Sequence, residues 1–246
     1  MTNYSLKRFI KSTLRLESYV VNYRLMSIFP PYLHQVIIGL LLSDGSIERP
    51  TRTGGARLSV ILGINSLPYL LHLYNLFEPY IDSGLSISEV YNKKTGKYYD
   101  TTRFKTGMMP IFVYYHDMFY HYDENAQRYI KRVPENIDSL MTPVVLANLI
   151  MGDGNLKGGE GIIRIYTNSF TRLEVEKLAF AITSKLDIKT SAVHDRNGQY
   201  ILTINKLQLN AVRTLIESYM HPSMLYKLGM CGGKVGFNYK NILDQI

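Results

Sequence analysis

The chain of 246 residues has a single cysteine, Cys231, and no tryptophan. One cysteine can form neither an internal disulfide nor a cysteine-based zinc site, so we expect a fold stabilised by its core, in a reducing compartment. The six histidines show no metal-ligand spacing, and no grouping with serine or cysteine indicates nucleophilic catalysis. No apolar run approaches the ~20 residues of a membrane span. We therefore expect a soluble protein with no membrane partner.

The charge balance is basic, with 28 Lys and Arg against 20 Asp and Glu, a formal charge of +8 and a pI near 9.3. This excess favours an anionic polymer as partner, although ribosomal and membrane-surface proteins share it. The 20 tyrosines and the abundant Ile, Asn and Lys are typical of an AT-rich coding sequence. An organelle genome is one such source, so we expect a mitochondrial protein, with the chloroplast as the alternative.

Two segments of the chain share one pattern, PYLHQVIIGLLLSDGSI at residues 31–47 and TPVVLANLIMGDGNL at residues 142–156. Each is an apolar run closed by Asp-Gly. The two aspartates, Asp44 and Asp153, are 109 residues apart (153 minus 44). This internal repeat predicts two copies of one structural unit.

The two apolar runs are short enough to be buried strands, but their first residues favour helices. Thr142 and Pro143 are typical of an N-cap followed by proline in the first turn, and Pro31 begins the first run. On a helix, Gly39 and Ser43 share a face. The second run has Asn148 and Gly152 at the equivalent positions, and small residues at this spacing let two helices pack closely.

The aspartates argue that these helices are more than unrelated core elements. A carboxylate at a helix C-terminus faces the negative end of the dipole and is destabilised by ~0.3–1 kcal/mol. If the helices pack through their small residues, Asp44 and Asp153 meet at one end and repel each other unless a cation lies between them. A single Asp-Gly is usually a turn. Two that close equivalent helices indicate a divalent-metal site.

The segments IIGLLLSDG (37–45) and LANLIMGDG (146–154) resemble the two motif copies of the LAGLIDADG homing endonucleases. The second copy departs at Asn148, where the family usually has glycine, which either loosens the helix pair or provides an interhelical hydrogen bond. The resemblance implies an α+β fold of two pseudo-twofold αββαββα repeats. Their antiparallel sheets form saddles, packed through the motif helices, that straddle a DNA duplex.

The residue pattern after each motif predicts the same order: helix, strand, strand, helix, strand, strand, helix. In the first unit we expect a strand at 57–64, a helix at 66–81, a hairpin around 92–96 and a helix at about 109–122. In the second unit we expect a strand at 161–168, a helix at 169–186, a hairpin turning at Asn197-Gly198 and a helix at 207–220.

The predicted organisation has five parts: an N-terminal extension (1–30), the first repeat (31–122), a polar and basic linker (123–141), the second repeat (142–228) and a glycine-rich tail (229–246). The extension carries several basic residues and one acidic residue. It is either an amphipathic targeting segment or a packed or DNA-facing arm.

Basic residues on strands and hairpins are suited to reading a major groove while neutralising phosphates, although surface lysines are often merely solvated. The first unit offers Arg52, Arg57, Lys93, Lys94, Lys97, Arg103 and Lys105. The second offers Lys157, Arg164, His194 and Arg196.

Hydrolysis of a phosphodiester needs an activated water, a Lewis acid and stabilisation of the leaving oxygen, all of which metals supply. Mg²⁺ suits a site with few carboxylates, and Mn²⁺ or Ca²⁺ can replace it. We expect Asp44 and Asp153 to be ligands, one for each strand cut, with help from adjacent carbonyls. The resemblance implies that a lysine in each unit orders water or stabilises charge near the scissile phosphates, and Lys131 in KRVP and Lys227 in MLYKL match those positions.

The leading hypothesis is a monomeric, site-specific homing endonuclease that binds a long double-stranded DNA target and makes a metal-dependent double-strand break. The first alternative is an RNA maturase that assists group I intron splicing on the same scaffold. A DNA-binding regulator without catalysis is the second. Both aspartates favour cleavage, because a pure RNA binder has no need of two like charges at a helix interface.

Overall fold

The computed structural model describes residues 28–51, 53–93 and 95–230. The candidate DNA contacts Arg52 and Lys94 lie outside the described residues, as do residues 1–27 of the predicted extension and residues 231–246 of the predicted tail. No helix in the described ranges is long and apolar enough to cross a membrane.

The predicted order of elements is confirmed in both halves of the chain. The first repeat contains α2 (Pro31–Leu41), β1 (Gly45–Glu48), β2 (Arg57–Gly63), α3 (Leu67–Phe77), β3 (Ser86–Asn92), β4 (Lys97–Lys105) and α4 (Pro110–Phe119). The second contains α6 (Pro143–Asp153), β7 (Gly154–Lys157), β8 (Ile162–Ile165), α7 (Arg172–Leu186), β9 (Thr190–His194), β10 (Tyr200–Ile204) and α8 (Leu209–Ile216).

Each repeat forms one four-stranded antiparallel sheet, with the strand orders β1-β2-β4-β3 and β7-β8-β10-β9. The two orders are the same when the repeats are aligned. In the first sheet Ser46 lies opposite Ser59, and in the second Asn155 lies opposite Arg164. The sheets are therefore two copies of one topology, as the internal repeat predicts.

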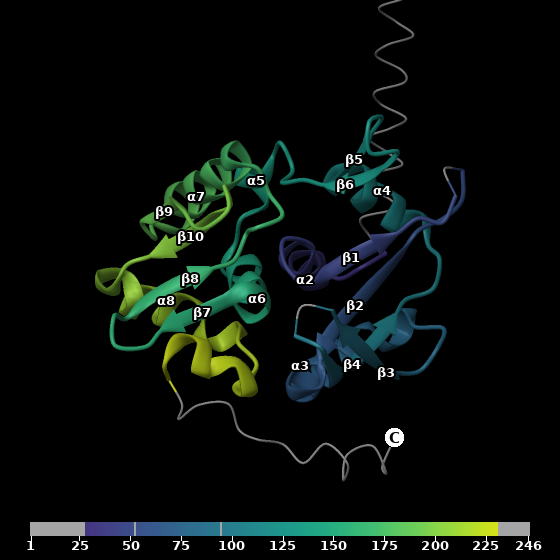
Figure 1. Cartoon of the computed structure of the whole chain (residues 1–246), viewed down its shortest axis with the longest axis horizontal. Coiled ribbons are helices and arrows are strands. Elements are labelled where there is room, and N and C mark those ends of the chain that lie inside the picture. The colour runs from purple at the N-terminus through teal and green to yellow at the C-terminus, as the bar shows by residue number, and fades with distance from the viewer. Residues whose placement is uncertain (1–27, 52, 94, 231–246) are drawn as a thin grey trace, which may run out of the picture.

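The helices α2 and α6 lie side by side between the two sheets, at the centre of the molecule (Figure 1). The Thr142 side chain accepts a hydrogen bond from the Val145 amide, so the predicted N-cap of α6 is confirmed. Residues 144–151 of α6 are buried without interruption, because the helix is covered by α2 on one side and by its own repeat on the others. One hydrophobic core runs through both repeats.

The segment predicted as a linker, 123–141, contains regular structure. β5 (Tyr120–Asp123) pairs with β6 (Arg128–Lys131), and α5 (Ile137–Leu140) follows. The helix expected to reach residue 122 therefore ends at Phe119. Tyr122 packs edge-on against Tyr129 across the hairpin, with 5.2 Å between ring centroids, and aromatic pairs of this kind stabilise strands.

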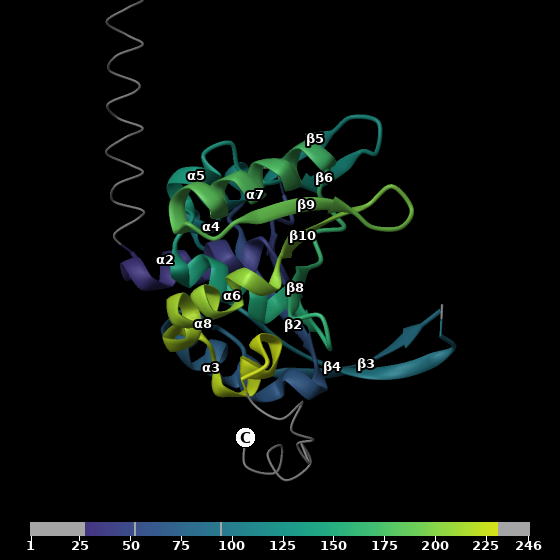
Figure 2. The ribbon, with the colours of Figure 1, turned by 90° about the vertical axis from the view of Figure 1, so that its left-hand side faces the viewer.

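The turn at Asn197-Gly198 is confirmed, since both residues have positive φ (57° and 72°), as a two-residue hairpin turn requires. The helix expected at 207–220 is shorter, with 3₁₀ turns on either side of α8. A further 3₁₀ segment, η5 (Pro222–Leu228), follows. The β3–β4 and β9–β10 hairpins project to the same side of the molecule (Figure 2).

Candidate active site

The close approach of α2 and α6 depends on the two small positions of each helix. A Cβ added to Gly39 would lie 2.5 Å from the Asn148 Cβ and 2.8 Å from the Val145 carbonyl oxygen. A Cβ added to Gly152 would lie 2.5 Å from the Ser43 Cβ. The two contacts between Cβ positions, Gly39 with Asn148 and Ser43 with Gly152, each join residues that are 109 apart in the chain, which is the relationship that pseudo-twofold symmetry requires. The predicted packing face is therefore correct.

This packing brings the two aspartates to the same end of the helix pair. Asp153 is the last residue of α6, and Asp44 lies in the turn that follows α2. A Cβ on Gly152, the neighbour of Asp153, would be 3.2 Å from Asp44 Oδ2. The carboxylates, one from each repeat, thus form a single acidic site at the seam between the repeats.

Burial and mutual repulsion perturb both carboxylates. Burial raises the pKa of Asp153, the negative charge of Asp44 raises it further, and the result is about 6 despite the opposing charges of Lys227 and Lys131. Burial also raises the pKa of Asp44, against the same two lysines. Without a bound cation, Asp153 therefore keeps its proton to a higher pH than an ordinary aspartate, up to about 6.

Lys131 lies at the end of β6 and reaches the turn after α2. Its Nζ donates to the carbonyl oxygens of Ser43 (3.0 Å) and Gly45 (2.7 Å). Burial lowers the pKa of Lys131 to about 8, although Asp153 and Asp44 oppose this change. An ammonium here compensates the carbonyls at the negative end of α2.

Lys227 lies in η5 and is only 9% exposed. Its Nζ donates to the carbonyl oxygens of Met151 and Gly152, both at 2.5 Å. It therefore does at the end of α6 what Lys131 does at the end of α2. The structure thus brings together Asp44, Asp153, Lys131 and Lys227, the four residues predicted to be catalytic.

The donor set suits a hard divalent cation with an open coordination shell. Two carboxylates meet, and no group of three or more His, Cys, Asp or Glu side chains able to hold a metal occurs among residues 28–51, 53–93 and 95–230. Mg²⁺ and Ca²⁺ prefer oxygen ligands and complete their shells with water or phosphate oxygens. Several of the adjacent carbonyls, which we expect to assist, accept hydrogen bonds from the two lysines.

Asn148 does not bond to the opposite motif helix. Its Nδ2 donates to the Val144 carbonyl within α6, and its Oδ1 accepts from the Tyr69 hydroxyl of α3 at 3.1 Å. The hydrogen bond therefore joins the second repeat to the first through α3. The sequence did not single out Tyr69, which resembles any other core aromatic in a helical stripe.

The predicted DNA contacts of the first sheet lie on strands β2 and β4 and at the β3–β4 hairpin. Arg57, Arg103 and Lys105 occupy the face turned away from the core, and all three are half-buried. Lys93 and Lys97 are exposed near the hairpin end.

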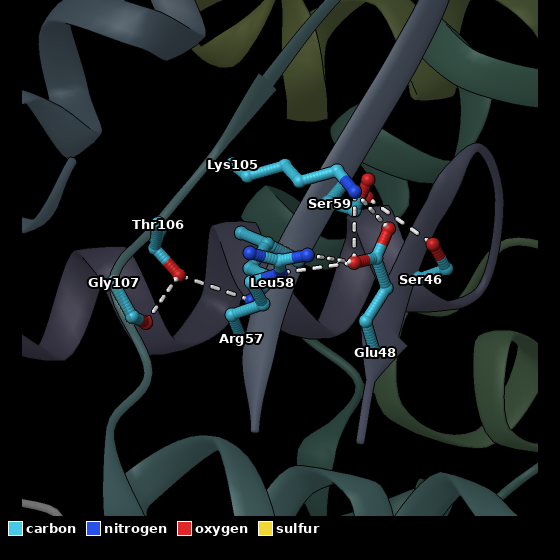
Figure 3. Close-up of polar contacts among 8 residues, drawn as sticks. All are labelled: Ser46, Glu48, Arg57, Leu58, Ser59, Lys105, Thr106 and Gly107. Atoms are coloured by element: carbon cyan, nitrogen blue, oxygen red, sulfur yellow. Dashed lines mark hydrogen bonds and ion pairs between the residues drawn. The ribbon is translucent and has the colours of Figure 1, made fainter. Parts of the chain in front are cut away.

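Two of these cations are ion-paired with an acidic residue that sequence reasoning missed. Glu48 binds both Arg57 and Lys105, as Figure 3 shows. Glu48 and Arg57 are directly opposite each other on β1 and β2. The pair could have been predicted if the register of these two strands had been evident from the sequence. The eight residues between the two strands form an irregular connection, so the register cannot be predicted from the sequence.

The predicted contacts of the second sheet are more dispersed. Arg164 lies on the outward face of β8, and Lys157 at the end of β7 is paired with Glu160. His194 packs edge-on against the Tyr200 ring, with 5.4 Å between centroids. Arg196 is strongly exposed beside the β9–β10 turn.

Comparison with known proteins gives one family and several relatives. Residues 34–211 match the model of the LAGLIDADG DNA endonuclease family. The cytochrome b mRNA maturase bI2 of Saccharomyces cerevisiae is 28% identical over 198 residues, which are 79% of this chain and 46% of the relative. The DNA endonuclease I-ChuI of Chlamydomonas applanata is 27% identical over 201 residues, which are 78% of this chain and 92% of the relative.

A solved structure, the homing endonuclease I-WcaI bound to its DNA recognition sequence, has the same fold. The TM-score is 0.71 at 23% identity, over 82% of this chain and 87% of that one. This chain spans about half the length of the yeast maturase but nearly all of the Chlamydomonas endonuclease.

Proposed function

This chain belongs to the LAGLIDADG DNA endonuclease family, and on that premise we propose that it is a site-specific homing endonuclease. It binds a long double-stranded DNA target as a monomer and makes a metal-dependent double-strand break by phosphodiester hydrolysis. The observation that carries the proposal is the meeting of Asp44 and Asp153, one from each repeat, between Lys131 and Lys227. Such a site offers one carboxylate for each DNA strand.

Asp44 and Asp153 would hold the divalent cation, for which we propose Mg²⁺. When bound, the metal supplies a Lewis acid for the phosphoryl oxygen and lowers the pKa of a coordinated water. The Lys131 and Lys227 ammonium groups, fixed by carbonyls at 2.5–3.0 Å, place positive charge beside the two carboxylates. There they balance the charge of the scissile phosphates and orient water.

The two sheets would bind the DNA on either side of this site. Their outward faces and hairpins carry the basic residues that phosphate contacts and groove readout require. Because the repeats lie in one chain and differ in sequence, residues 31–122 and 142–228 would each read a different half of an asymmetric target. Relatives named as intron-encoded endonucleases and the AT-rich composition support an origin in an organelle, and we propose the mitochondrion.

The test separates binding from cutting. A randomised double-stranded DNA library is enriched for sequences that the full chain binds in the presence of a chelator, and Mg²⁺ is then added. We expect wild-type protein to cut the selected DNA in both strands. Asp44→Asn and Asp153→Asn should bind it equally well and lose double-strand cutting by about a hundredfold or more.

Asp138→Asn is the matched control, since Asp138 is an exposed aspartate of α5 away from the seam. It should bind and cut like wild type. If both seam variants cut at the wild-type rate, the aspartates have no part in the mechanism. If no sequence is enriched from the library, site-specific DNA binding itself is wrong.

A second candidate function, RNA maturation, is favoured by the likeness to the yeast maturase. Group I intron RNA from the locus that encodes this chain would be spliced with and without the protein. Stimulation that persists in Asp153→Asn, with no DNA cutting by wild type, would establish the maturase and displace the endonuclease.

A further inference from the structure

Three charged side chains of the first sheet converge on its outward face, where β1 and β4 end and β2 begins (Figure 3). Arg57 Nε and Nη2 both donate to Glu48 Oε2, at 2.9 and 2.8 Å. Lys105 Nζ contacts Oε1 at 2.7 Å and Oε2 at 2.9 Å. The small side chains of Ser46 and Ser59, opposite each other beneath the cluster, leave room for these longer ones.

Both oxygens of the Glu48 carboxylate are bound by cations of the first sheet. Burial alone would raise its pKa, but the hydrogen bonds from Lys105 and Arg57 outweigh burial and hold the pKa below its usual value. Its side chain is 32% exposed. An ionised carboxylate with both oxygens bound to cations of its own chain has little capacity left for DNA, so its effect must act through its partners.

Arg57 keeps part of its hydrogen-bonding capacity. A guanidinium has five N–H groups in a rigid plane, and Glu48 takes two of them, on the edge formed by Nε and Nη2. The edge formed by Nη1 and Nη2 is the fork that binds guanine O6 and N7 in a major groove. Fixing one edge of the plane restricts the directions in which the other can point.

The second repeat lacks this arrangement. From the registers of the two sheets, the equivalents of Glu48 and Arg57 are Lys157 and Ile162, and the equivalent of Lys105 is Thr203. Lys157 pairs instead with Glu160 in the following turn. The cluster is therefore specific to the first half, as a base-specific contact on an asymmetric target would be.

We propose that Glu48 is a positioning residue for base recognition, which holds the Arg57 guanidinium so that its free edge contacts a guanine in the major groove of the first half-site. Glu48 also restrains Lys105, which would otherwise add a sequence-independent phosphate contact. Together, the two effects lower the affinity for DNA of any sequence and raise the preference for the target sequence. The proposal rests on the proposed DNA-binding function and assigns one specificity contact within it.

The experiment compares binding preferences of full-length variants, using the randomised duplex library in chelator. Wild type should require guanine at one position of the half-site bound by the first repeat, by roughly tenfold to a hundredfold over other bases. Glu48→Gln and Arg57→Lys should both lose this preference, at the same single position. Glu48→Gln should also bind unrelated DNA more tightly and with a steeper dependence on salt, because Lys105 and Arg57 are released.

Glu176→Gln is the matched control. It breaks an exposed pair with Arg172 on α7 by the same change of charge, and should alter no base preference. Arg57→Lys retains the charge, so it tests the proposal even if Glu48→Gln is poorly folded. A preference unchanged at every position in folded Glu48→Gln, or in Arg57→Lys, would overturn the proposal while leaving DNA binding intact. Failure of wild type to enrich any sequence would instead overturn the proposed function.

Discussion

Gly39 and Asn148, equivalent residues of the two repeats, face each other across the helix pair with no room for a further methyl group. Asn148 is 2% exposed and held by Tyr69, so it cannot move away readily. The helix spacing that brings Asp44 and Asp153 together is therefore set by a glycine in α2. The asparagine of the second motif is accommodated because the first motif kept its glycine.

Gly39→Ala should destabilise the fold. Its Cβ would lie 2.5 Å from the Asn148 Cβ and 2.8 Å from a backbone oxygen, so the helices must separate or shift. We expect a loss of about 1–3 kcal/mol in the free energy of unfolding, the usual range for overpacking. Urea unfolding followed by circular dichroism measures it. Gly63→Ala is the control, since a Cβ there meets nothing within 4 Å, and equal losses in both variants would contradict the packing argument.

The fold and the four seam residues were predictable from the sequence because their signals are local. Each motif helix has its proline at the start and its Asp-Gly at the end, and alternating or helical periodicity marks the elements between. A repeat offset of 109 residues then places equivalent residues face to face. The roles of Lys131 and Lys227 remain proposals, but the resemblance of their short motifs to the family implied their position beside the carboxylates.

Features that depend on register or on long-range contacts were not predictable. The Glu48 pairing requires the alignment of β1 with β2 across an irregular segment. The end of α4 was placed too late, because the aromatic run that continues through residues 120–122 fits a helix and a strand equally well. Whether Asn148 would loosen the helices or bond to a partner was decided by Tyr69, 79 residues away.

The raised pKa of Asp153 makes stability without metal depend on pH. A carboxyl whose pKa rises from 3.8 in the unfolded chain to about 6 in the fold binds its proton more tightly when folded. Its ionisation therefore costs stability as pH rises from about 4 to about 6. Asp153→Asn cannot ionise and so escapes this cost. In chelator, the free energy of unfolding of the variant minus that of wild type should therefore increase as pH rises from about 4 to about 6. Urea unfolding at several pH values measures the difference.

Glu135→Gln serves as the control, because its stability difference from wild type should change with pH in the opposite direction. Its hydrogen bond and ion pair with Lys177 lower the pKa of Glu135, so the carboxylate stabilises the fold above its ordinary pKa of 4.5. The variant should become less stable than wild type as pH rises through that value. A flat difference for Asp153→Asn between pH 4 and 6 would show that folding, through burial and the charge of Asp44, does not raise the pKa of Asp153.

The last prediction concerns the contribution of Lys131 and Lys227 to DNA cutting. Lys131→Met and Lys227→Met keep much of the aliphatic stem but remove the ammonium beside Asp44 and Asp153, so cutting of the selected DNA should fall by about a hundredfold. Binding in chelator should change little, because neither lysine lies on the outward face of a sheet. Lys185→Met, at an exposed position near the end of α7, should leave both unchanged. Since each lysine also binds helix-end carbonyls, thermal melts must accompany the assay, and a variant that folds and cuts normally would remove that lysine from the mechanism.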